Sequence, residues 1–481
     1  MPRPATATSE SALSDSAAAR AVHLHGHYAP VLDEIDAVDL PVEGALPPEL
    51  VGRYLRNGPN PLPGSDPGHW FTGPGMLHGV RLNAGRAEWY RNRWVRTRAL
   101  EGHPFLSEAG VDLTAVPANT HVVAHAGRVL ALVENGLPYE VDRALGTRGP
   151  CDFGGRLTTA MTAHPKTDPD TGELHFFGYS PFPPFLTYHR LSAAGELVVS
   201  RPVEVRAPTM THDFAITAHH VVWLDLPMTF QWERMAAGMP FGWDDAYGAR
   251  LGVMRSDDAA SIVRWFEIDP CYVFHVGTAY EDAQGRIVVD GARYSPSDVA
   301  VMWDGEPTMP LDGDPAGTAA STGSSRMHRW TLDPATGAVT ETPLDDRGVE
   351  FPTLDDARVG RSARYRYAVA SSSRANAVVK LDLGEGGGGR TTAHELGPDI
   401  AAGEAVFVPS EVPGRAEDDG WLLTIVTRRD GSASQLLVLD ATDVTRAVAT
   451  VALPRGVPAG FHGSWVPDHA PPGSSSSRTG P

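Results

Sequence analysis

The chain has 481 residues, 42% of them hydrophobic and 21% charged, and its 59 acidic and 40 basic side chains leave a formal charge of −19. These values are typical of a soluble globular protein with a large core, and the acidic excess argues against a nucleic-acid partner, which would require clustered Lys and Arg. The two cysteines, Cys151 and Cys271, exclude a disulfide framework and a paired-cysteine zinc motif, and both are expected to be buried. No apolar run approaches the ~20 residues of a membrane helix and no signal sequence is recognisable, so a cytoplasmic protein is expected.

Both ends of the chain are rich in small polar residues. Residues 1–20 and 469–481 are therefore predicted to be disordered, and residues 21–468 to form a single domain. Within that domain, the polar or Gly-rich stretches 304–325 and 384–389 are expected to be surface excursions.

The rest of the chain consists of short β-branched or aromatic runs that meet Gly, Asp or Asn turns, as expected of hairpins. The segments DPDTGEL (168–174) and DPATGAV (333–339) are near repeats of one such turn. Long amphipathic windows are scarce, and MTFQWERMAAGM (228–239) is among the few predicted helices. Roughly 400 residues of hairpins exceed a sandwich but fit several four-stranded blades around an axis, so an all-β propeller is predicted.

Three histidines lie close together in the segment APTMTHDFAITAHHVVWLDLP (207–227). His219 and His220 fall in the turn between two predicted strands, where solvated polar residues are ordinary. His212 instead opens a strand, and the alternation of a strand puts it on the same face as the apolar Phe214 and Ile216. A histidine on such a face is buried and must satisfy both ring nitrogens, which an ordinary core histidine also does.

Three further histidines share the setting of His212. His164, His275 and His462 each begin or end an apolar strand, and they are far apart in the sequence. They are therefore placed on different blades, whose inner strands converge only at the axis of a propeller. Four imidazoles that meet there would form a metal site suited to Fe, Cu, Zn or Ni.

The remaining histidines show no such convergence. His23, His25 and His27 have metal-like spacing in HLHGH, but they adjoin the polar N-terminal segment and are interpreted as a solvated cluster. Six others lie near turns or at strand edges: His69, His78, His121, His125, His175 and His189.

Eight motifs follow one another in an order that resembles one known family. They are GRYLRNGPNP (52–61), WFTGPGMLHGV (70–80), AHPKTDPDTGEL (163–174), MTHDFAIT (210–217), FHVGTAYED (274–282), EFP (350–352), GEAVFVPS (403–410) and GFHGSW (460–465). Together they resemble the carotenoid cleavage oxygenases, which include apocarotenoid and stilbene cleavers and the retinoid isomerohydrolases. The resemblance extends from about residue 35 to residue 468.

The resemblance implies a seven-bladed β-propeller with an axial Fe(2+) site, capped on one face by loops and short helices. The metal ligands that it implies are His164, His212, His275 and His462. The residues that it places behind these ligands are Glu134, Glu350 and Glu404. A carboxylate that accepts the outer N–H of an imidazole orients the ring and adds negative charge that four neutral ligands lack, although each glutamate alone could be an ordinary surface acid.

The implied activity is oxidative cleavage of a conjugated C=C bond by O2, with no organic cofactor. Thr120 matches a family threonine whose methyl group crowds an open position on iron, and an ordinary strand residue is an equal interpretation. The substrate would be a lipophilic polyene, which needs an apolar tunnel. Aromatic and Met residues in 180–188 and 228–243 could line this tunnel or pack in the core, and peripheral contact with the inner membrane surface through 228–243 is expected. No obligate protein partner is inferred.

Other activities stay open at the level of sequence: lignostilbene-type cleavage, redox-neutral isomerisation on the same iron, and binding without turnover. The chain departs from the family pattern at Pro74, Gly277 and Thr353, where an acid, an Asn and an Arg are usual, and none of these changes removes a predicted ligand. Stilbene cleavers tend to carry a Lys just before the first glutamate to hold a phenolate. Here that residue is Val133, which favours a carotenoid or apocarotenoid.

Overall fold

The computed structural model describes residues 22–468, apart from 238, 259, 305–323, 372–375 and 385–388. The predicted disordered ends, 1–20 and 469–481, lie outside the described residues, as do most of the predicted surface excursions at 304–325 and 384–389.

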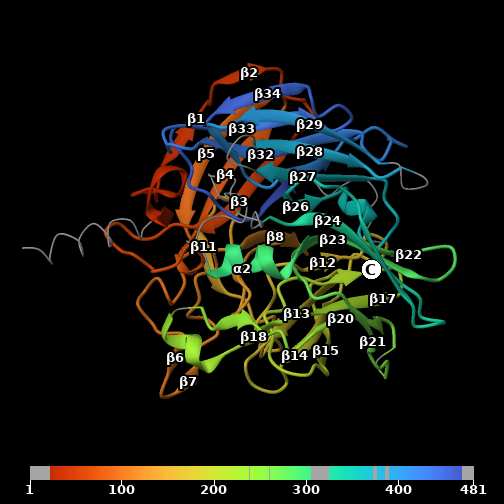
Figure 1. The fold of residues 1–481 in the computed structure, drawn as a ribbon. Helices are drawn as coiled ribbons and strands as arrows, with labels where there is room; N and C mark the ends of the chain where they lie inside the picture. Colours follow the sequence, from red (N-terminus) through yellow and green to blue (C-terminus); the bar gives the residue numbers. More distant parts are fainter. Residues whose placement is uncertain are drawn as a thin grey trace, which may run out of the picture.

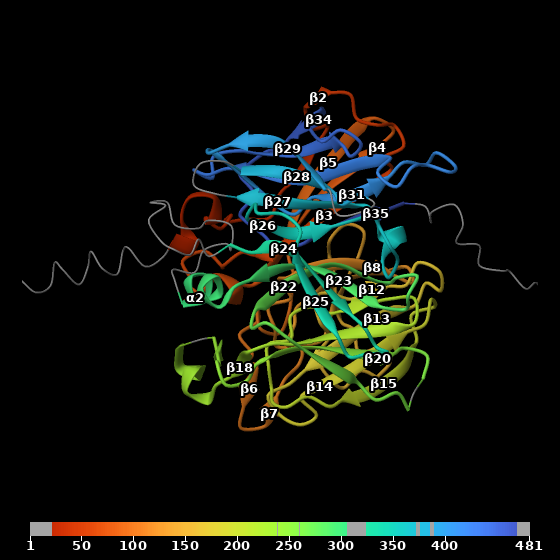
Figure 2. The same ribbon diagram turned by 45° about the vertical axis from the view of Figure 1, so that its right-hand side comes forward.

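Seven antiparallel sheets of four to six strands stand around a common axis as the blades of a propeller (Figures 1 and 2). The predicted all-β propeller and its seven blades are therefore confirmed. Blade 1 contains β1 (Asp36–Val38), β3 (Gly52–Pro59), β4 (Gly75–Asn83), β5 (Arg86–Trp94) and β35 (Gly463–Pro467). Blade 2 contains β8 (His121–His125), β9 (Arg128–Leu132), β10 (Tyr139–Val141) and β11 (Thr147–Pro150), and blade 3 contains β12 (Lys166–Thr167), β13 (Leu174–Tyr179), β14 (Leu186–Leu191) and β15 (Leu197–Val203).

The other four blades follow in chain order around the ring. Blade 4 contains β16 (Ala215–Ile216), β17 (His220–Asp225), β20 (Ala249–Arg255) and β21 (Arg264–Ile268), and blade 5 contains β22 (Tyr272–Glu281), β23 (Ile287–Tyr294), β24 (Arg326–Leu332) and β25 (Val339–Pro343). Blade 6 contains β26 (Val349–Thr353), β27 (Tyr365–Ser371), β28 (Asn376–Asp382) and β29 (Arg390–Gly397). Blade 7 contains β2 (Val42–Gly44), β30 (Ile400–Ala402), β31 (Val406–Pro409), β32 (Gly420–Arg428), β33 (Ser434–Asp440) and β34 (Ala447–Ala452).

The ring is closed by two strand pairs that join distant parts of the sequence. β35 pairs antiparallel with β3, so that Gly52 lies opposite Pro467. β2 pairs antiparallel with β34, so that Val42 lies opposite Val451. Blades 1 and 7 therefore each combine strands from both ends of the described chain, which ties the ring together without a covalent link.

The hydrophobic core is divided into seven clusters of buried residues among the described residues, and each cluster fills the space between two neighbouring blades. The largest fully buried side chains include Trp223 and Trp330, each of which contributes about 1.5–3 kcal/mol or more by burial. Because every sheet is packed on both faces, the apolar residues form runs along the strands. Cys151 and Cys271 are buried free thiols, as predicted, and burial raises the pKa of Cys271 to about 12.

The near-repeated turns at 168–174 and 333–339 have the same structure in blades 3 and 5. In the first, the N–H of Gly172 donates to the carbonyl of Asp168 at 2.8 Å, and in the second the N–H of Gly337 donates to Asp333 at the same distance. Both glycines adopt positive φ values, 71° and 83°, which other residues reach only with strain. The repeat in the sequence therefore encodes one hairpin turn that is used twice.

Short elements cover the two faces of the ring. They are η1 (Val22–Leu24), η2 (Gly26–Tyr28), η3 (Trp70–Thr72), β6 (Leu106–Ser107), β7 (Gly110–Val111), β18 (Met228–Phe230), η4 (Trp232–Ala237), β19 (Phe241–Trp243), α2 (Pro296–Asp304) and η5 (Asp356–Arg358). Figures 1 and 2 place α2 and β18 on one face, and η5, the short teal helix on the right of Figure 2, on the opposite face. The cap of loops and short helices implied by the resemblance therefore lies on the α2 face.

The predicted helix at 228–239 is wrong for its first half. Met228–Phe230 forms β18, which pairs with β19, and only Trp232–Ala237 is helical, as a 3-10 turn. Aromatic residues that face one another across a hairpin outweigh the weak helical pattern here. In the described residues, no helix is both long and apolar enough to cross a membrane.

Candidate metal centre

Four buried or nearly buried histidines, His164, His212, His275 and His462, meet at the axis. Each offers one ring nitrogen, and these atoms lie within 4.8 Å of one another. The Nε2 atoms are 3.0 Å apart in the His164–His212 pair and 3.1 Å apart in the His275–His462 pair. Within the described part of the chain, this is the one group of His, Cys, Asp or Glu side chains with such spacing. The structure thus brings together all four predicted ligands, and the group could hold a metal ion.

Irregular inner strands direct these side chains toward the axis. Three of the histidines lie within three residues before β12, β16 or β35. The fourth, His275, lies within β22, whose register with β23 shifts on both sides of Val276. β26 shifts in the same way between Glu350 and Thr353. Such bulges re-aim individual side chains, which explains how regular blades supply an irregular site.

Two glutamates lie behind histidines of the neighbouring blade. Nδ1 of His275 is 2.6 Å from Oε2 of Glu350, and Nδ1 of His462 is 3.0 Å from Oε1 of Glu404. The second carboxylate oxygen of Glu404 accepts the N–H of Gly463 at 2.8 Å. Oε2 of Glu350 also accepts the N–H of Phe351 at 2.7 Å, so a backbone N–H helps to fix each carboxylate beside its imidazole.

The third glutamate reaches across the ring. Glu134 follows β9 in blade 2, and its Oε1 accepts a short hydrogen bond from Nδ1 of His212, which precedes blade 4. The hydroxyl of Tyr179 donates to Oε2 of Glu134 at 2.6 Å. The three pairings, which the sequence alone left unassigned, are thereby established, and His164 is the histidine that none of the three glutamates contacts at Nδ1.

These hydrogen bonds determine which nitrogen faces the axis. Because a carboxylate only accepts, Nδ1 of the three partnered histidines carries the hydrogen and Nε2 keeps its lone pair. Three lone pairs that converge on one point repel one another unless a cation lies between them. The donor set therefore fits a divalent metal ion such as Fe(2+), for which imidazole is a suitable ligand.

The charges of the site agree with this arrangement. Burial and the neighbouring imidazoles, His462 first, hold the pKa of His164 well below its ordinary value, which keeps this ring neutral. Burial alone would lower the pKa of His212, but the carboxylate of Glu134 outweighs it and raises that pKa. Burial would raise the pKa of Glu404, but His462 outweighs this effect and lowers it to about 2. The carboxylate of Glu404 thus remains ionised and favours a cation at the imidazoles.

Thr120 lies at the edge of the site, directly before β8. Its carbonyl accepts the N–H of His462 at 3.2 Å, and its hydroxyl donates to Oδ1 of Asn119 at 3.0 Å. The amide of Asn119 in turn donates to the carbonyls of Phe71 and Gly73, both at 2.7 Å. Thr120 is therefore fixed beside a predicted ligand, and the effect of its methyl group on a metal stays a prediction.

A fifth histidine, His121, was not selected from the sequence. Its ring centre lies 5.1 Å from that of His462 and 6.1 Å from that of His164. Nδ1 is 2.8 Å from the carbonyl of Ala163, and Nε2 is 3.4 Å from the hydroxyl of Ser464. Burial lowers the pKa of His121 to about 4, so the ring is neutral and carries one N–H. The 2.8 Å contact assigns this hydrogen to Nδ1, which donates to Ala163, because the contact of Nε2 with the carbonyl of Gly463 is longer, at 3.3 Å. Its position on an innermost strand, next to which or within which the four histidines also lie, is the signal in the sequence that could have found it.

The histidines interpreted as ordinary turn residues lie outside the centre. His219 is exposed, and Nδ1 of His220 is 3.0 Å from Oε1 of Glu281, both at the turn between β16 and β17 as predicted.

The interpretation of the N-terminal histidines as a solvated cluster is wrong for two of the three. His25 is exposed, but His27 is buried and His23 is only 2% exposed, with Nε2 2.8 Å from Oδ1 of Asp66. The N–H of His27 donates to the carbonyl of Arg429, because η1 and η2 pack on the propeller.

On the α2 face, aromatic side chains form a wall next to the histidines. The ring of Phe274 lies 5.2 Å from His212 and 6.3 Å from Trp303, which belongs to α2. Phe71 lies 6.2 Å from Trp303 and 5.5 Å from Phe461. The capping elements thus supply apolar surroundings that suit a hydrocarbon.

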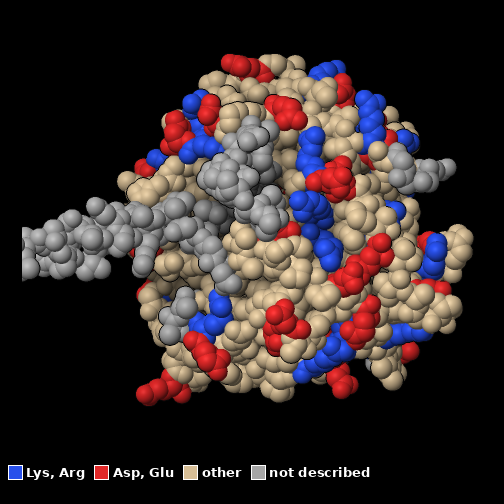
Figure 3. Space-filling model, viewed as in Figure 1, with Lys and Arg blue, Asp and Glu red and all other residues tan. Residues whose placement is uncertain are grey.

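On the face that Figure 3 shows, Lys and Arg are interspersed with Asp and Glu, without a broad area of one sign among the described residues.

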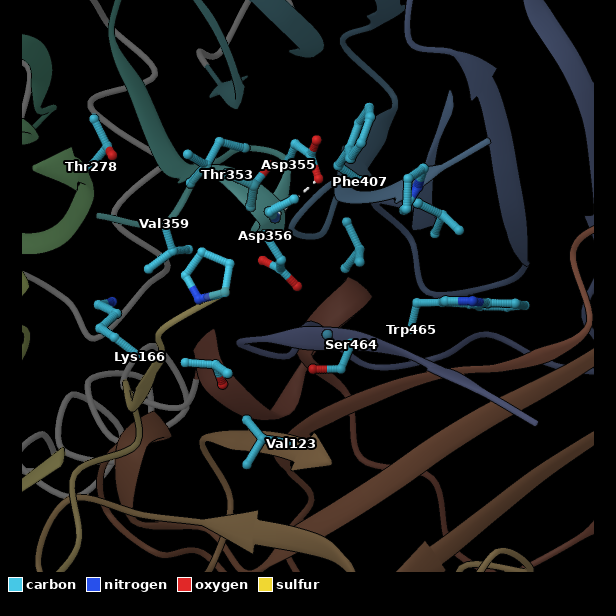
Figure 4. Close-up of a pocket in the computed structure, with 18 of the residues that line it drawn as sticks. Val123, Lys166, Thr278, Thr353, Asp355, Asp356, Val359, Phe407, Ser464 and Trp465 are labelled. Atoms are coloured by element: carbon cyan, nitrogen blue, oxygen red, sulfur yellow. Dashed lines mark hydrogen bonds between the residues drawn. The ribbon is translucent and has the colours of Figure 1, made fainter. Parts of the chain in front are cut away.

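A cavity of about 970 Å³, lined by charged, polar and apolar side chains, lies along the axis. His164, His275 and His462 line its deep end, and it extends to Val412, which is 59% exposed. One strand of every blade contributes to its wall, including β8 at Val123 (Figure 4). Two of the positions at which the chain departs from the family pattern, Gly277 and Thr353, line this axial cavity.

A propeller that gathers four imidazoles on its axis, three of them held by carboxylates, belongs to the class of proteins with a histidine-based metal-binding site. A family model described as retinal pigment epithelial membrane protein matches residues 28–467. The carotenoid cleavage oxygenase of Mycobacterium tuberculosis (strain ATCC 25618 / H37Rv) is 38% identical, and the match covers 92% of this chain and 97% of that protein. Carotenoid 9,10(9',10')-cleavage dioxygenase 1 of Arabidopsis thaliana is 33% identical, with 92% and 89% covered.

Solved structures show the same relationship. Cobalt-substituted Synechocystis apocarotenoid oxygenase has 28% sequence identity and a TM-score of 0.76, with 91% of this chain and 97% of that chain covered. The lignostilbene dioxygenase of Pseudomonas brassicacearum has 28% identity and a TM-score of 0.80, with 93% and 99% covered. The chain belongs to the carotenoid cleavage oxygenase family and is an enzyme of the oxygenase class, which confirms the resemblance found in its motifs.

Proposed function

We propose that this protein is a non-haem Fe(2+) dioxygenase that cleaves a conjugated C=C bond of a carotenoid or apocarotenoid. The observation that carries the proposal is the convergence of four imidazoles beside an aromatic wall. In the overall reaction, O2 delivers one oxygen atom to each carbon of the broken double bond. Two carbonyl products form, and no further reductant is needed.

The four histidines would hold the iron, and a bound ferrous ion would supply vacant coordination positions and the redox chemistry that activates O2. Glu134, Glu350 and Glu404 keep the hydrogen on Nδ1 of their histidines, so that each Nε2 stays available as a donor. The cobalt-substituted form of Synechocystis apocarotenoid oxygenase supports a divalent first-row metal.

The aromatic wall would bind the polyene and exclude water from it. Phe274 and Trp303 stack within 6.3 Å, with 30° between their planes, and Phe274 also contacts His212. A rigid conjugated chain that lies against such rings has its double bond held beside the histidines. Thr120, fixed between Asn119 and His462, would restrict the space next to the metal.

A second candidate is cleavage of a lignostilbene, which the TM-score of 0.80 with a lignostilbene dioxygenase favours. The residue before Glu134 is Val133, which is apolar and 7% exposed. A valine provides no cation for a phenolate at that place, so the carotenoid or apocarotenoid is preferred. Redox-neutral isomerisation is the third candidate.

The test is anaerobic reconstitution with Fe(2+), followed by addition of O2 and a panel of carotenoids, apocarotenals and stilbenes, with products identified by mass spectrometry. The proposal expects two carbonyl products that contain oxygen from labelled O2, and His212→Ala is expected to lose iron and turnover together. His220→Ala, which changes a histidine outside the centre, is the matched control. Products without label would indicate isomerisation, and a His212→Ala enzyme with full turnover would refute the iron site.

Peripheral contact with the inner face of the cytoplasmic membrane is part of the proposal. Phe182, Trp232 and Met235 are 51%, 56% and 42% exposed, and the rings of Phe182 and Trp232 lie 5.8 Å apart. Exposed aromatic side chains that cluster in this way suit the headgroup region of a bilayer. A polyene that partitions into lipid could then enter without crossing water.

A further inference from the structure

The axial cavity is acidic. The acids that line it are Glu49, Asp213, Asp355, Asp356, Glu404 and Glu411. Its two basic residues are both paired with lining acids, because Lys166 lies 2.8 Å from Asp213 and Arg415 forms a short ion pair with Asp355. The cavity therefore keeps a surplus of negative charge.

The acids are distributed along the whole length of the cavity. Glu411 is exposed at the outer end next to Val412, Glu49 is half-buried, and Glu404 is buried at the deep end beside His462. Asp356 lies between them in η5, and Figure 4 shows its carboxylate in the middle of the lining side chains. The side chain of Asp356 is exposed within the cavity. Desolvation by the surrounding cavity wall, together with the negative charges of Asp355 and Glu404, raises the pKa of this carboxyl group.

Two buried hydroxyl groups on the wall have no hydrogen-bond partner among the described residues. They are Oγ1 of Thr278, which is 6% exposed, and Oγ of Ser410, which is 7% exposed. Each of these oxygens has almost no solvent-accessible surface, so both hydroxyls belong to the closed wall, and the charge of the cavity comes from its carboxylates.

The two sides of the metal centre differ in the kind of molecule or ion that can pass along them. On the α2 face, Phe71, Phe274 and Trp303 form an apolar wall, and a hydrated divalent cation would lose its water there without replacement. On the η5 face, carboxylate side chains are interspersed with apolar ones along a wall that ends at His164, His275 and His462.

We propose that the axial cavity is the route by which the metal ion enters and reaches the four histidines, and that Asp356 holds the hydrated cation on the way. The proposal rests on the metal dependence proposed above. The cation then enters from the η5 face of the propeller, and the polyene enters from the α2 face. A channel lined by charges of one sign concentrates counter-ions and raises their rate of entry.

Thr353 provides a way to test the route. It lines the cavity from β26, and its hydroxyl donates to the carbonyl of Ala405 at 2.7 Å. Thr353→Arg adds a positive charge to the cavity, whereas Thr353→Gln loses the same hydrogen bond without adding charge. The pair therefore separates the effect of charge from the effect of the lost hydroxyl.

The experiment measures Co(2+) uptake by metal-free protein in a stopped-flow spectrometer, through the visible absorption of the bound ion. Asp356→Asn is expected to slow uptake by about 3- to 10-fold at low salt, and Thr353→Arg is expected to be slower than Thr353→Gln by a similar factor. Added salt should reduce both differences, because it screens the charges. The spectrum of the loaded protein should stay unchanged, because neither residue contacts the four histidines.

Glu108→Gln, which removes an exposed acid from the tip of the β6–β7 hairpin, is the matched control and should leave the rate unchanged. Equal rates in the wild type, Asp356→Asn and Thr353→Arg would overturn the route while leaving the metal centre intact. A wild-type protein that takes up no Co(2+) would overturn both the route and the proposed metal dependence. The two failures are therefore distinguishable without any measurement of activity.

Discussion

Nδ1 of His121 donates a hydrogen bond to the carbonyl of Ala163 at 2.8 Å, and Ala163 directly precedes His164. The other nitrogen of the same ring lies 3.4 Å from the hydroxyl of Ser464, two residues after His462. One neutral imidazole thus holds the backbone beside two of the four converging histidines. His121 is therefore a positioning residue for the centre.

His121→Phe is expected to weaken Co(2+) binding by about 10-fold, within the range for residues that support metal ligands. The variant keeps a ring in place but leaves the buried carbonyl of Ala163 without its donor. His121→Asn, whose amide can donate from a similar position, should recover most of the affinity. The control is His125→Phe, because His125 lies on the same strand and contacts the carbonyl of Ser192, away from the centre. Equal losses in the Phe and Asn variants would contradict the positioning role.

Glu350→Gln is expected to lower metal affinity by about 10- to 100-fold, because the amide is uncharged and supports the imidazolium-like charge of a metal-bound His275 less well. Equilibrium titration with Fe(2+) or Co(2+) measures the effect. Glu281→Gln is the matched control, since Glu281 also pairs with a histidine, His220, but outside the centre. A similar loss in both variants would indicate a general effect on stability.

The metal-free protein is expected to lose stability as the pH falls from about 6.5 to about 4. Burial lowers the pKa of His175 and that of His189 from 6.5 to about 4. In this range the unfolded chain binds protons that the folded chain cannot, so acid favours unfolding; above pH 6.5 both states are neutral and the effect vanishes. Each histidine contributes about 2 kcal/mol by about pH 5.

Thermal unfolding as a function of pH measures this dependence. His189→Gln, which removes one titrating ring that stacks on Phe176, should flatten the curve between pH 6.5 and 4, even if it lowers the melting temperature at neutral pH. An unchanged slope would show that His189 does not contribute.

The double variant Phe182→Asp and Trp232→Asp is expected to reduce binding to vesicles of phosphatidylcholine and phosphatidylglycerol at least several-fold in co-sedimentation. Both side chains are more than half exposed, so the substitutions remove apolar contacts with lipid and leave the core intact. Val198→Asp, at an exposed apolar position of β15, is the control. Wild-type protein that remains in the supernatant would contradict the membrane contact. Substitution of Phe230 or Phe241, which pack against each other at 5.7 Å, would test folding instead.

The propeller and the four histidines could be predicted because their signals are local. Hairpin turns recur along the chain, and each histidine adjoins an apolar strand, so topology alone brings them to one axis. The partners of Glu134, Glu350 and Glu404 could not be predicted, because they depend on bulges and on contacts across the ring that no local pattern encodes.

His121 escaped sequence reasoning for a related reason. Its function is to fix a neighbouring backbone, and a hydrogen bond to a carbonyl leaves no pattern of residue types. The prediction for the N-terminal histidines was wrong for a different reason. Their polar neighbours indicate exposure to solvent, yet His23 and His27 are buried by tertiary packing. The alternation of polar and apolar residues predicts strands well, but it does not predict which short turns pack against the propeller.

Because β35 closes blade 1, an ion bound by the four histidines would also stabilise the closed ring. His462 stands directly before β35, while its three companion rings come from blades 3, 4 and 5. A cation bound by all four histidines would link the last strand to blades 3, 4 and 5. Blade 1 could then not separate from the ring without the loss of a metal ligand. Iron would then stabilise the closed propeller in addition to taking part in the reaction. Removal of the ion by a chelator would be expected to accelerate amide exchange first in β3 and β35.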